Sequence, residues 1–244
     1  MSQAGFDGFE PETSFMGVFS DPNRMLEEVQ KSGLELGVLC LVEDWLNLDE
    51  TEYERSQADQ WIDFLGHFPK TLFLLVQMPG KDRSELETRQ HNLLSCVNSI
   101  AKRAADKGII CSYHPNSPSG SVFRTEEDYK ILLGGLDSEV IGYTPDVGHI
   151  GRGEMDPLTI IRQYRDLVNC VHYKDMFEDG GWAPMGSGCL DFGGITKELV
   201  QSGFSGWIIV EDECDQAIGD PDGVTLQDGK YIEHSLRPLI GTEN

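Results

Sequence analysis

Short, nearly continuous apolar runs alternate along the chain with longer segments of helical spacing. Runs such as GVLCLVE at 37–43 and TLFLLVQM at 71–78 are apolar on both faces, as buried parallel strands are. This alternation predicts an α/β fold with parallel pairing, and no linker-like tract divides residues 1–244, so we expect a single domain. The predicted strands are 5–10, 34–43, 71–78, 109–113, 140–146, 167–173 and 207–211. The predicted helices are 23–31, 52–65, 83–107, 125–133, 157–164, 194–201 and 231–239.

Polar side chains stand at the carboxyl ends of these predicted strands. They are Glu10, Glu43, Gln77, His114, Asp146, His172 and Glu211. Periodicity alone does not separate an open sheet from a closed barrel, but barrel enzymes gather their chemistry from the carboxyl ends of several strands. An open sheet usually carries a glycine-rich phosphate turn at one crevice, and the sequence has no GxGxxG run. The pattern therefore favours a (β/α)8 barrel.

Charge and composition exclude several classes of partner. The chain carries 42 acidic and 19 basic side chains, a formal net charge of −23, and no basic run that could neutralise phosphates. We therefore expect no nucleic-acid partner and no membrane partner, since no apolar stretch is long enough to span a bilayer. The six cysteines are far apart and mostly lie in apolar runs, which indicates reduced thiols and a cytoplasmic protein.

Three motifs carry candidate chemistry. Asp146 and His149 lie in DVGH after a buried strand, His172 lies in VHYKD, and Glu211 begins the acidic stretch EDE. Each has a plainer interpretation: Asp146 as the start of a turn, His172 as a core residue, and the acids as a solvated loop, an interpretation we keep for Asp212 but not for Glu211. Together they supply the mixed oxygen and nitrogen donors that suit Mn, Mg, Co or Zn. His114, in YHPN, is the expected fourth member.

The chain resembles the sugar phosphate isomerase/epimerase family of xylose isomerase-like TIM barrels. The resemblance runs from about residue 4 to 239 and rests on AGFDGFE, YHPN, DVGHIGRGEMDP, VHYKD, GSGCLDF and GWIIVEDECD. The order of these motifs is most similar to inosose dehydratase and related cyclitol or keto-sugar dehydratases. The resemblance implies a divalent metal held by His114, Asp146, His172 and Glu211, with His149 contacting substrate hydroxyls. AGFDGFE is similar to the family's second strand, so we expect the barrel to lack its first strand and helix.

One departure from the family bears on the reaction. The family usually has Glu where this chain has His114, and its two ligating glutamates act as paired acid and base. With Glu211 as the matching carboxylate, elimination of water, which needs one base, fits better than two-base epimerisation. A metal-dependent lyase acting on a sugar, keto-sugar or cyclitol is therefore the first hypothesis, with Glu211, His114 and His149 as catalytic residues. An isomerase or epimerase with His114 as second base is the alternative, and a catalytically silent interaction subunit is a third.

Further residues are candidates for binding the substrate. Lys174 is expected to neutralise an oxyanion or to pair with its neighbour Asp175, and Arg152 lies in the loop beside the proposed site. Glu10 is a candidate ligand for substrate hydroxyls. The glycine-rich loop 176–190, which contains Trp182, is long enough to close over a substrate, and Trp45 is either a packing residue or a sugar-stacking platform. Homo-oligomerisation is a further expectation, because an open barrel exposes strand edges.

Overall fold

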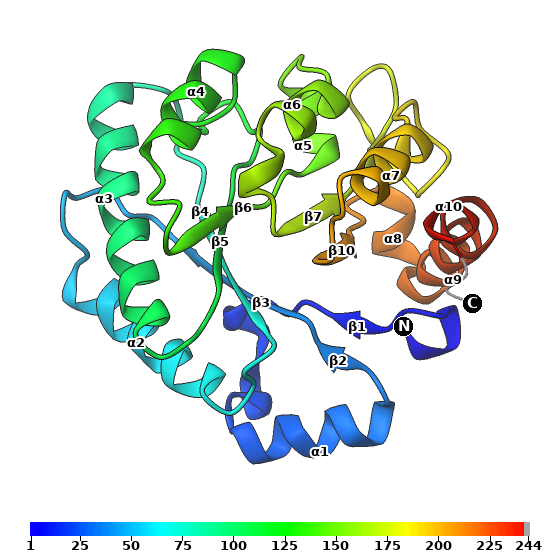
Figure 1. The fold of residues 1–244 in the computed structure, drawn as a ribbon, viewed down its shortest axis with the longest axis horizontal. Coiled ribbons are helices and arrows are strands. Elements are labelled where there is room, and N and C mark those ends of the chain that lie inside the picture. Colours follow the sequence, from blue (N-terminus) through cyan, green and yellow to red (C-terminus); the bar gives the residue numbers. More distant parts are fainter. Residues whose placement is uncertain (242–244) are drawn as a thin grey trace.

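The computed structural model describes residues 1–241, and its parallel strands curve into an incomplete barrel (Figure 1). The parallel strands are β1 (Gly8–Phe9), β2 (Glu35–Leu36), β3 (Val38–Glu43), β4 (Leu72–Gln77), β5 (Cys111–His114), β6 (Ile141–Tyr143), β7 (Cys170–Tyr173) and β10 (Trp207–Val210). β1 pairs with β2, β3 to β6 form one continuous sheet, and β7 pairs with β10, all in parallel. Isolated bridges from Tyr143 to Val168 and from Asp146 to His172 join β6 to β7. The predicted α/β barrel fold is confirmed.

The barrel is open between its first and last strands. The strand predicted at 34–43 is interrupted at Gly37, so that β2 pairs with β1 and β3 pairs with β4. If β2 and β3 are counted as one interrupted strand, the barrel wall has seven strands. Within residues 1–241 no strand pairing joins β1 to β10. We call the gap between β1 and β10 the seam. It lies where the sequence predicted a missing strand.

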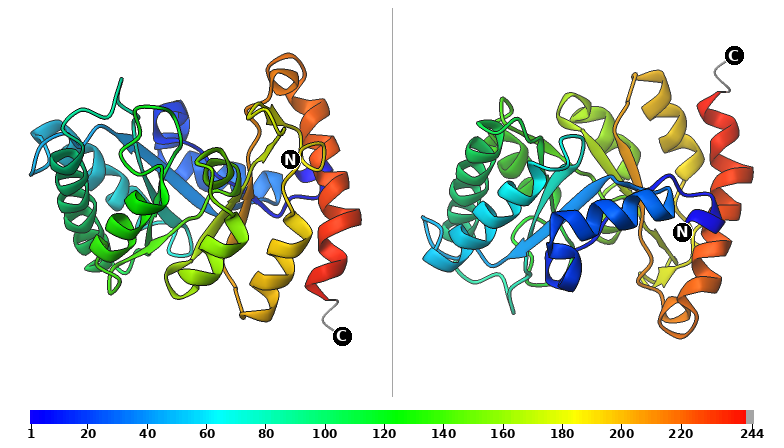
Figure 2. Two further views of the ribbon diagram at one scale, coloured as in Figure 1. Left: turned by 90° about the horizontal axis from the view of Figure 1, so that it is seen from above. Right: turned by 90° about the horizontal axis from the view of Figure 1, so that it is seen from below.

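Ten α-helices within the described chain surround the sheet. They are α1 (Pro22–Ser32), α2 (Glu52–Leu65), α3 (Leu86–Ala105), α4 (Glu126–Gly135), α5 (Val147–Arg152), α6 (Pro157–Gln163), α7 (Phe192–Gln201), α8 (Asp215–Gly219), α9 (Pro221–Tyr231) and α10 (Arg237–Ile240). The predicted start signals are present: Asp21 accepts a hydrogen bond from the N–H of Asn23, and Asp156 accepts one from the N–H of Thr159. Figure 2 shows α9 and α10 running along one end of the molecule beside the N-terminus.

One helical prediction is wrong in its bounds, and one helix was not predicted. The last helical segment begins at Pro221, ten residues before the predicted start at 231, and passes through a π-helix (Ile232–Leu236) into α10. Gly223 and Gly229 lower the helix propensity of this segment, and the cap that starts it is the side chain of Asp220 on the N–H of Gly223. The DVGHIGR stretch, expected to be a loop, forms α5.

Two apolar cores hold the sheet. The larger one fills the space between the sheet and the helices, and a smaller one inside the barrel contains Val38, Cys40, Leu72, Leu74 and Cys170. The Trp207 side chain packs against this inner cluster. A Cβ atom on Gly37 would lie 2.7 Å from the Trp207 indole, and one on Gly8 would lie 2.8 Å from both that indole and the carbonyl oxygen of Glu35. The two glycines therefore make room for an indole that reaches across from β10 to β1 and β2.

Candidate metal and active site

Four side chains from successive strand ends meet above the inner core. His114 ends β5, Asp146 follows β6, His172 lies in β7 and Glu211 follows β10. Each offers one ligand atom, and these four atoms all lie within 4.8 Å of one another. His114 and His172 are buried, with ring centroids 4.7 Å apart, and Asp146 is fully buried. The sequence predicted this set of residues, and the fold brings them together.

The two carboxylate oxygens of Asp146 have different roles: one caps a helix and the other faces the cluster. As the N-cap of α5, its Oδ1 accepts a hydrogen bond of 2.7 Å from the N–H of His149. Its Oδ2 lies 3.4 Å from Nε2 of His114 and so faces the cluster. The turn interpretation and the ligand interpretation of Asp146 are therefore compatible, because a carboxylate has an oxygen for each.

His172 lies between two carboxylates. Its Nδ1 is 3.3 Å from Oε2 of Glu211, and its Nε2 is 3.1 Å from Oε2 of Glu10. Burial would lower the pKa of His172, but Glu10, a hydrogen bond to Cys170 and the bond to Glu211 raise it well above its usual value. Glu10, predicted to bind substrate, thus lies directly against the imidazole of His172.

A buried lysine lies beside the cluster. Lys174 is 1% exposed, and its Nζ lies 2.7 Å from Glu213, 3.2 Å from Glu211 and 4.0 Å from Asp146. Burial disfavours its charge, yet these three carboxylates together raise the pKa of Lys174 above its ordinary value. Asp175, the pairing partner considered for Lys174, instead accepts backbone hydrogen bonds. Lys174 therefore remains an ammonium ion within contact distance of Glu211.

The two carboxylates in the cluster are held ionised. Burial would raise the pKa of Asp146, but His149, Lys174 and a hydrogen bond to His114 lower it below its ordinary value. Burial likewise opposes ionisation of Glu211, and His172 and Lys174 outweigh it, so the pKa of Glu211 is also lowered. Both groups carry negative charge at neutral pH.

His149 lies at the edge of the same site. Its Nδ1 is 2.7 Å from Oγ of Ser117, and its Nε2 is 3.5 Å from Nζ of Lys174. Burial lowers the pKa of His149 to about 3, with Asp146 opposing that shift, so the imidazole is neutral at physiological pH. Because an ammonium faces Nε2, we assign the proton to Nδ1, which donates to Ser117.

Trp182 covers this edge of the site. It lies in a short antiparallel hairpin, β8 (Asp175–Met176) and β9 (Trp182–Ala183), within the loop predicted to close over substrate. Its ring centroid is 5.3 Å from that of His149 and 4.9 Å from Nζ of Lys174. The guanidinium of Arg152, which is exposed, stacks 4.4 Å from the centroid of the same indole.

The loop that carries Trp182 is anchored by one carboxylate. Asp175 accepts hydrogen bonds from the backbone N–H groups of Met176, Gly186, Gly188 and Leu190. These donors come from both ends of the loop, so the Asp175 side chain ties its two ends together.

Two interpretations of single residues are settled by burial. Trp45 is fully buried and its backbone N–H donates to Oε1 of Glu54, which makes it a packing residue and not a sugar-stacking platform. Asp212, expected to be solvated, has both carboxylate oxygens buried. It faces Asp228 of α9, and burial together with Asp212 raises the pKa of Asp228 to about 8. The solvated interpretation of Asp212 is wrong because α9 covers the exit of β10.

Sequence reasoning missed several partners in the site. Ser117 on His149 and Glu213 on Lys174 each lie more than thirty residues away in sequence from the residue they contact. Their residue types are common in loops, and no spacing signal marks them. The EDE stretch was the one available hint for Glu213.

A parallel barrel with histidine and carboxylate side chains gathered at the carboxyl ends of its strands defines the class of barrel with a candidate metal site. The sequence profile of the xylose isomerase-like TIM barrel family matches residues 1–237, and the chain belongs to that family.

Several relatives resemble the chain over nearly its whole length. The inosose dehydratase of Bacillus velezensis is 24% identical over 262 residues, covering 96% of this chain and 86% of that protein. The IolI protein with a bound zinc atom superposes with a TM-score of 0.77 at 12% identity, covering 98% of this chain and 89% of that one. The 3-keto-D-glucoside 4-epimerase YcjR of E. coli, in its apo form, gives a TM-score of 0.76 at 18% identity, covering 95% and 90%. The structural likenesses establish the fold.

No helix in the described part of the chain combines the length and the apolar character needed to cross a bilayer.

Proposed function

We propose that this protein is a divalent-metal-dependent lyase that removes water from a keto-sugar or cyclitol next to its carbonyl group. Its relatives support the broader class of carbohydrate-acting enzymes, and those named inosose dehydratase support the lyase. The observation that carries the proposal is the meeting of His114, Asp146, His172 and Glu211 at one point.

The donor set fits a divalent cation. Asp146, Glu211, Glu10 and Glu213 bring four carboxylates to the site, and the ammonium of Lys174 and the imidazole of His172 are their cationic partners. A divalent ion would remove most of the remaining negative charge, which is costly where Asp146 is fully buried. His114 also has a buried Nδ1 with no hydrogen-bond partner. Two imidazole and two carboxylate donors suit Mn, Mg or Co, and Zn also accepts such ligands.

Glu10 supports the same assignment from outside the ligand set. A histidine that binds a metal usually donates its other ring N–H to a carboxylate, which fixes its tautomer and orientation. With Nδ1 of His172 turned toward Glu211 and the cluster, Nε2–H donates to Glu10. Glu10 is therefore proposed to orient His172, in addition to any contact with substrate.

Each residue of the site has a separate role in the proposed reaction. A bound divalent ion would supply Lewis-acid stabilisation of charge that develops on the substrate oxygens. Glu211 is ionised and 38% exposed, so it can take the proton from the carbon next to the carbonyl. The bond from the following carbon to its hydroxyl then breaks, and the proton held by Glu211 passes to the departing hydroxide, which leaves as water. Lys174 keeps its proton and stabilises the resulting negative charge. Neutral His149 and Arg152 are proposed to contact the substrate, His149 at a hydroxyl near the cluster and Arg152 at a more distant part.

Isomerisation or epimerisation is the second candidate, and the position of His114 favours it. Its imidazole lies in the same cluster as Glu211, so it is near enough to the site to serve as a second proton-transfer group. The two reactions differ in product. Elimination releases water, whereas isomerisation incorporates solvent deuterium at carbon and keeps every hydroxyl.

The test combines metal analysis with turnover. We expect a divalent ion to co-purify, and added Mn²⁺ to raise the melting temperature of chelator-treated protein, an effect that Asp146→Asn removes. Proton NMR in deuterated water with a panel of keto-cyclitols and ketoses should then show loss of water. Glu211→Gln should lower turnover by about 100-fold or more while the protein stays folded.

Glu35→Gln is the matched control, because Glu35 is an exposed carboxylate on β2 and should leave turnover unchanged. Unchanged turnover in Glu211→Gln would reject Glu211 as the base. Deuterium incorporation without loss of water would replace the lyase by an isomerase, and a metal-free, inactive protein would leave the interaction subunit.

A further inference from the structure

We propose that the seam binds an extended segment of a second polypeptide, which pairs through its main chain with β1 on one side and β10 on the other. The inference concerns the barrel wall and stands apart from the proposed reaction. It rests on three observations: the direction of the backbone amides at the seam, the residues that line the cavity there, and the size of that cavity.

The backbone amides of both edges point into the seam. In a strand, the N–H and C=O of one residue point to the same side, and successive residues alternate. The N–H of Glu211 donates to Tyr173 of β7, so Ile208 and Val210 direct their amide groups away from β7 and into the seam. The C=O of Phe9 accepts from Gly37, so Gly8 and Glu10 direct theirs away from β2. Two parallel edges thus face one another without pairing within residues 1–241.

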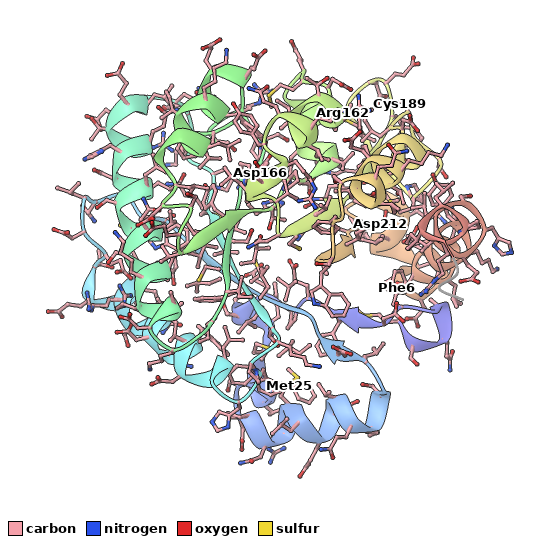
Figure 3. All side chains as sticks on the ribbon, in the orientation of Figure 1. Phe6, Met25, Arg162, Asp166, Cys189 and Asp212 are labelled. Carbon is pink, nitrogen blue, oxygen red and sulfur yellow. The ribbon has the colours of Figure 1, made fainter. Side chains whose placement is uncertain are left out.

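A cavity of about 790 Å³ fills the space between these edges. It is lined by five consecutive residues of β10 and its exit, 207–211, and by consecutive residues 4–10 around β1. A cavity inside a barrel, or outside it under the helices, would be lined by alternate residues of a strand, because neighbouring side chains point to opposite faces. Consecutive lining shows that this cavity passes through the wall. Phe6 and Asp212, both labelled in Figure 3, lie on its two sides.

The cavity has the volume of one short strand. A strand advances about 3.3 Å per residue, neighbouring strands lie about 4.8 Å apart, and packed layers lie about 10 Å apart, which gives roughly 160 Å³ per residue. The cavity, part of which extends among the C-terminal helices, therefore has room for a segment of at most about five residues. The strands beside it are of similar length, since β7 and β10 have four residues each and β3 and β4 have six.

The walls define the chemistry of the occupant. Trp207 and Ile209 line the inner side, and Val224 and Leu236 of the C-terminal helices line the outer side, so the segment must be apolar on both faces. All barrel strands are parallel, so the segment ends beside Glu10 and Glu211. Glu12, Asp212 and Glu213 also line that end, which favours a cationic side chain at the segment's carboxyl end.

The ring of helices is interrupted in the same sector. In Figure 1 the helices follow one another around the sheet except between α10 and α1, beside β1. A small apolar ligand would cover the unpaired amides at the seam without satisfying their hydrogen bonds, which is unfavourable for every buried amide group. An extended main chain satisfies both edges, as in strand addition to an open sheet. A second polypeptide is therefore favoured over an apolar small molecule.

The test uses short peptides and the full chain. The probe is a fluorescein-labelled amide of Thr-Val-Ile-Val-Lys, which is apolar and ends in a cation. We expect saturable binding by fluorescence anisotropy, and amide hydrogen exchange slowed about ten-fold or more at residues 8–10 and 208–210 in the complex. Neither measurement requires a metal or turnover, so the inference can fail while the proposed function holds, and the reverse.

Two controls distinguish binding through main-chain hydrogen bonds from binding through apolar side-chain contacts alone. The same peptide with N-methyl groups on both valines keeps its apolar side chains but cannot donate to one edge, and it should bind about ten-fold more weakly or worse. Ile208→Pro removes one N–H that points into the seam and leaves the amides that bond to β7, and it should weaken binding of the unmethylated peptide. Equal affinity of the methylated peptide, or no binding of either peptide at about 1 mM, would overturn the proposal. If Ile208→Pro fails to fold, the comparison of the two peptides still decides.

Discussion

At the residue scale, the electrostatics of the site depend on Lys174, whose ammonium contacts three carboxylates. Its ammonium lies within 4.0 Å of Glu213, Glu211 and Asp146 and is almost completely buried. A cation in that position competes with a metal ion for the same carboxylates, yet it also stabilises negative charge on a substrate. The two effects can be separated by removing the charge and keeping the volume.

The substitution Lys174→Met should therefore affect metal affinity and turnover differently. We expect metal affinity, measured by calorimetry with Mn²⁺, to stay the same or to increase, because a repelling charge is lost. Turnover should fall about 100-fold or more, because oxyanion stabilisation is lost. Lys174→Arg keeps the charge and serves as the comparison. Equal loss of metal binding and turnover in Lys174→Met would show that Lys174 only supports the local structure.

The residues that could be predicted from the sequence share one property. His114, Asp146, His172 and Glu211 each interrupt or end an apolar strand, and the carboxyl ends of parallel strands meet at one edge. Ser117, Glu213 and Asp228 could not be predicted as partners, because their contacts are set by how loops and α9 fold back over the strands. A loop serine or an acid in a chain with 42 acidic residues carries no signal of its own.

At the element scale, the packing of β10 against β1 and β2 passes through one side chain. The Trp207 indole occupies the space that Cβ atoms on Gly8 and Gly37 would need. The sequence predicted the strand at 34–43 but not its interruption at Gly37, since a glycine inside an apolar run does not reveal which side chain lies against it. The start of the last helix was missed for a related reason. Gly229 reads as a helix breaker in the sequence, whereas in the structure it allows the helix to lie close to the carbonyl of Ala4.

Gly37→Ala should destabilise the protein by about 1–3 kcal/mol, because its methyl group would overlap the indole. Adding Trp207→Leu should recover part of that loss, which a double-mutant cycle from urea unfolding would measure. Gly8→Ala is the contrasting variant: Trp207→Leu should rescue it less, since the Glu35 carbonyl also blocks its Cβ. Additive effects of Gly37→Ala and Trp207→Leu would contradict the contact.

The contact of α9 with the exit of β10 should make stability depend on pH. The pKa of Asp228 is raised to about 8, first by burial and then by Asp212, so between its ordinary value and pH 8 the folded state holds a proton that the unfolded state has lost. Stability from this group is thus present at low pH and is lost as the pH rises toward 8.

Asp228→Asn should remove that dependence, because a neutral amide keeps an oxygen to accept the hydrogen bond from the N–H of Met185. Near pH 8.5 we expect the variant to be more stable than the parent by roughly 1–2 kcal/mol, and near pH 5 the two should be similar. Urea unfolding at both pH values checks this. A constant difference across the range would show that Asp228 does not change its protonation state.

At the scale of the whole molecule, the charge of −23 is spread over a chain that must remain compact. Mutual repulsion among acidic groups destabilises a folded protein, and salt screens it over the Debye length. The same charge is consistent with the expectation that nucleic acids are not partners of this chain.

Raising NaCl from about 10 mM to about 300 mM should therefore raise the melting temperature by about 2–4 °C, corresponding to roughly 1 kcal/mol. The measurement is made by calorimetry in the presence of a chelator, so that divalent ions do not contribute, and choline chloride should give the same increase. A melting temperature that falls or stays constant with salt would show that ion pairs such as the one from Arg103 to Glu50 outweigh the repulsion.

The Asp175 side chain has a consequence for engineering. Because it fastens both ends of the loop 176–190 through backbone N–H groups, the hairpin tip at 178–181, between β8 and β9, can be exchanged without touching the residues that line the site. Libraries that vary the length and sequence of this hairpin tip, with Asp175 retained, should alter which molecules the enzyme selects while the scaffold below keeps its shape.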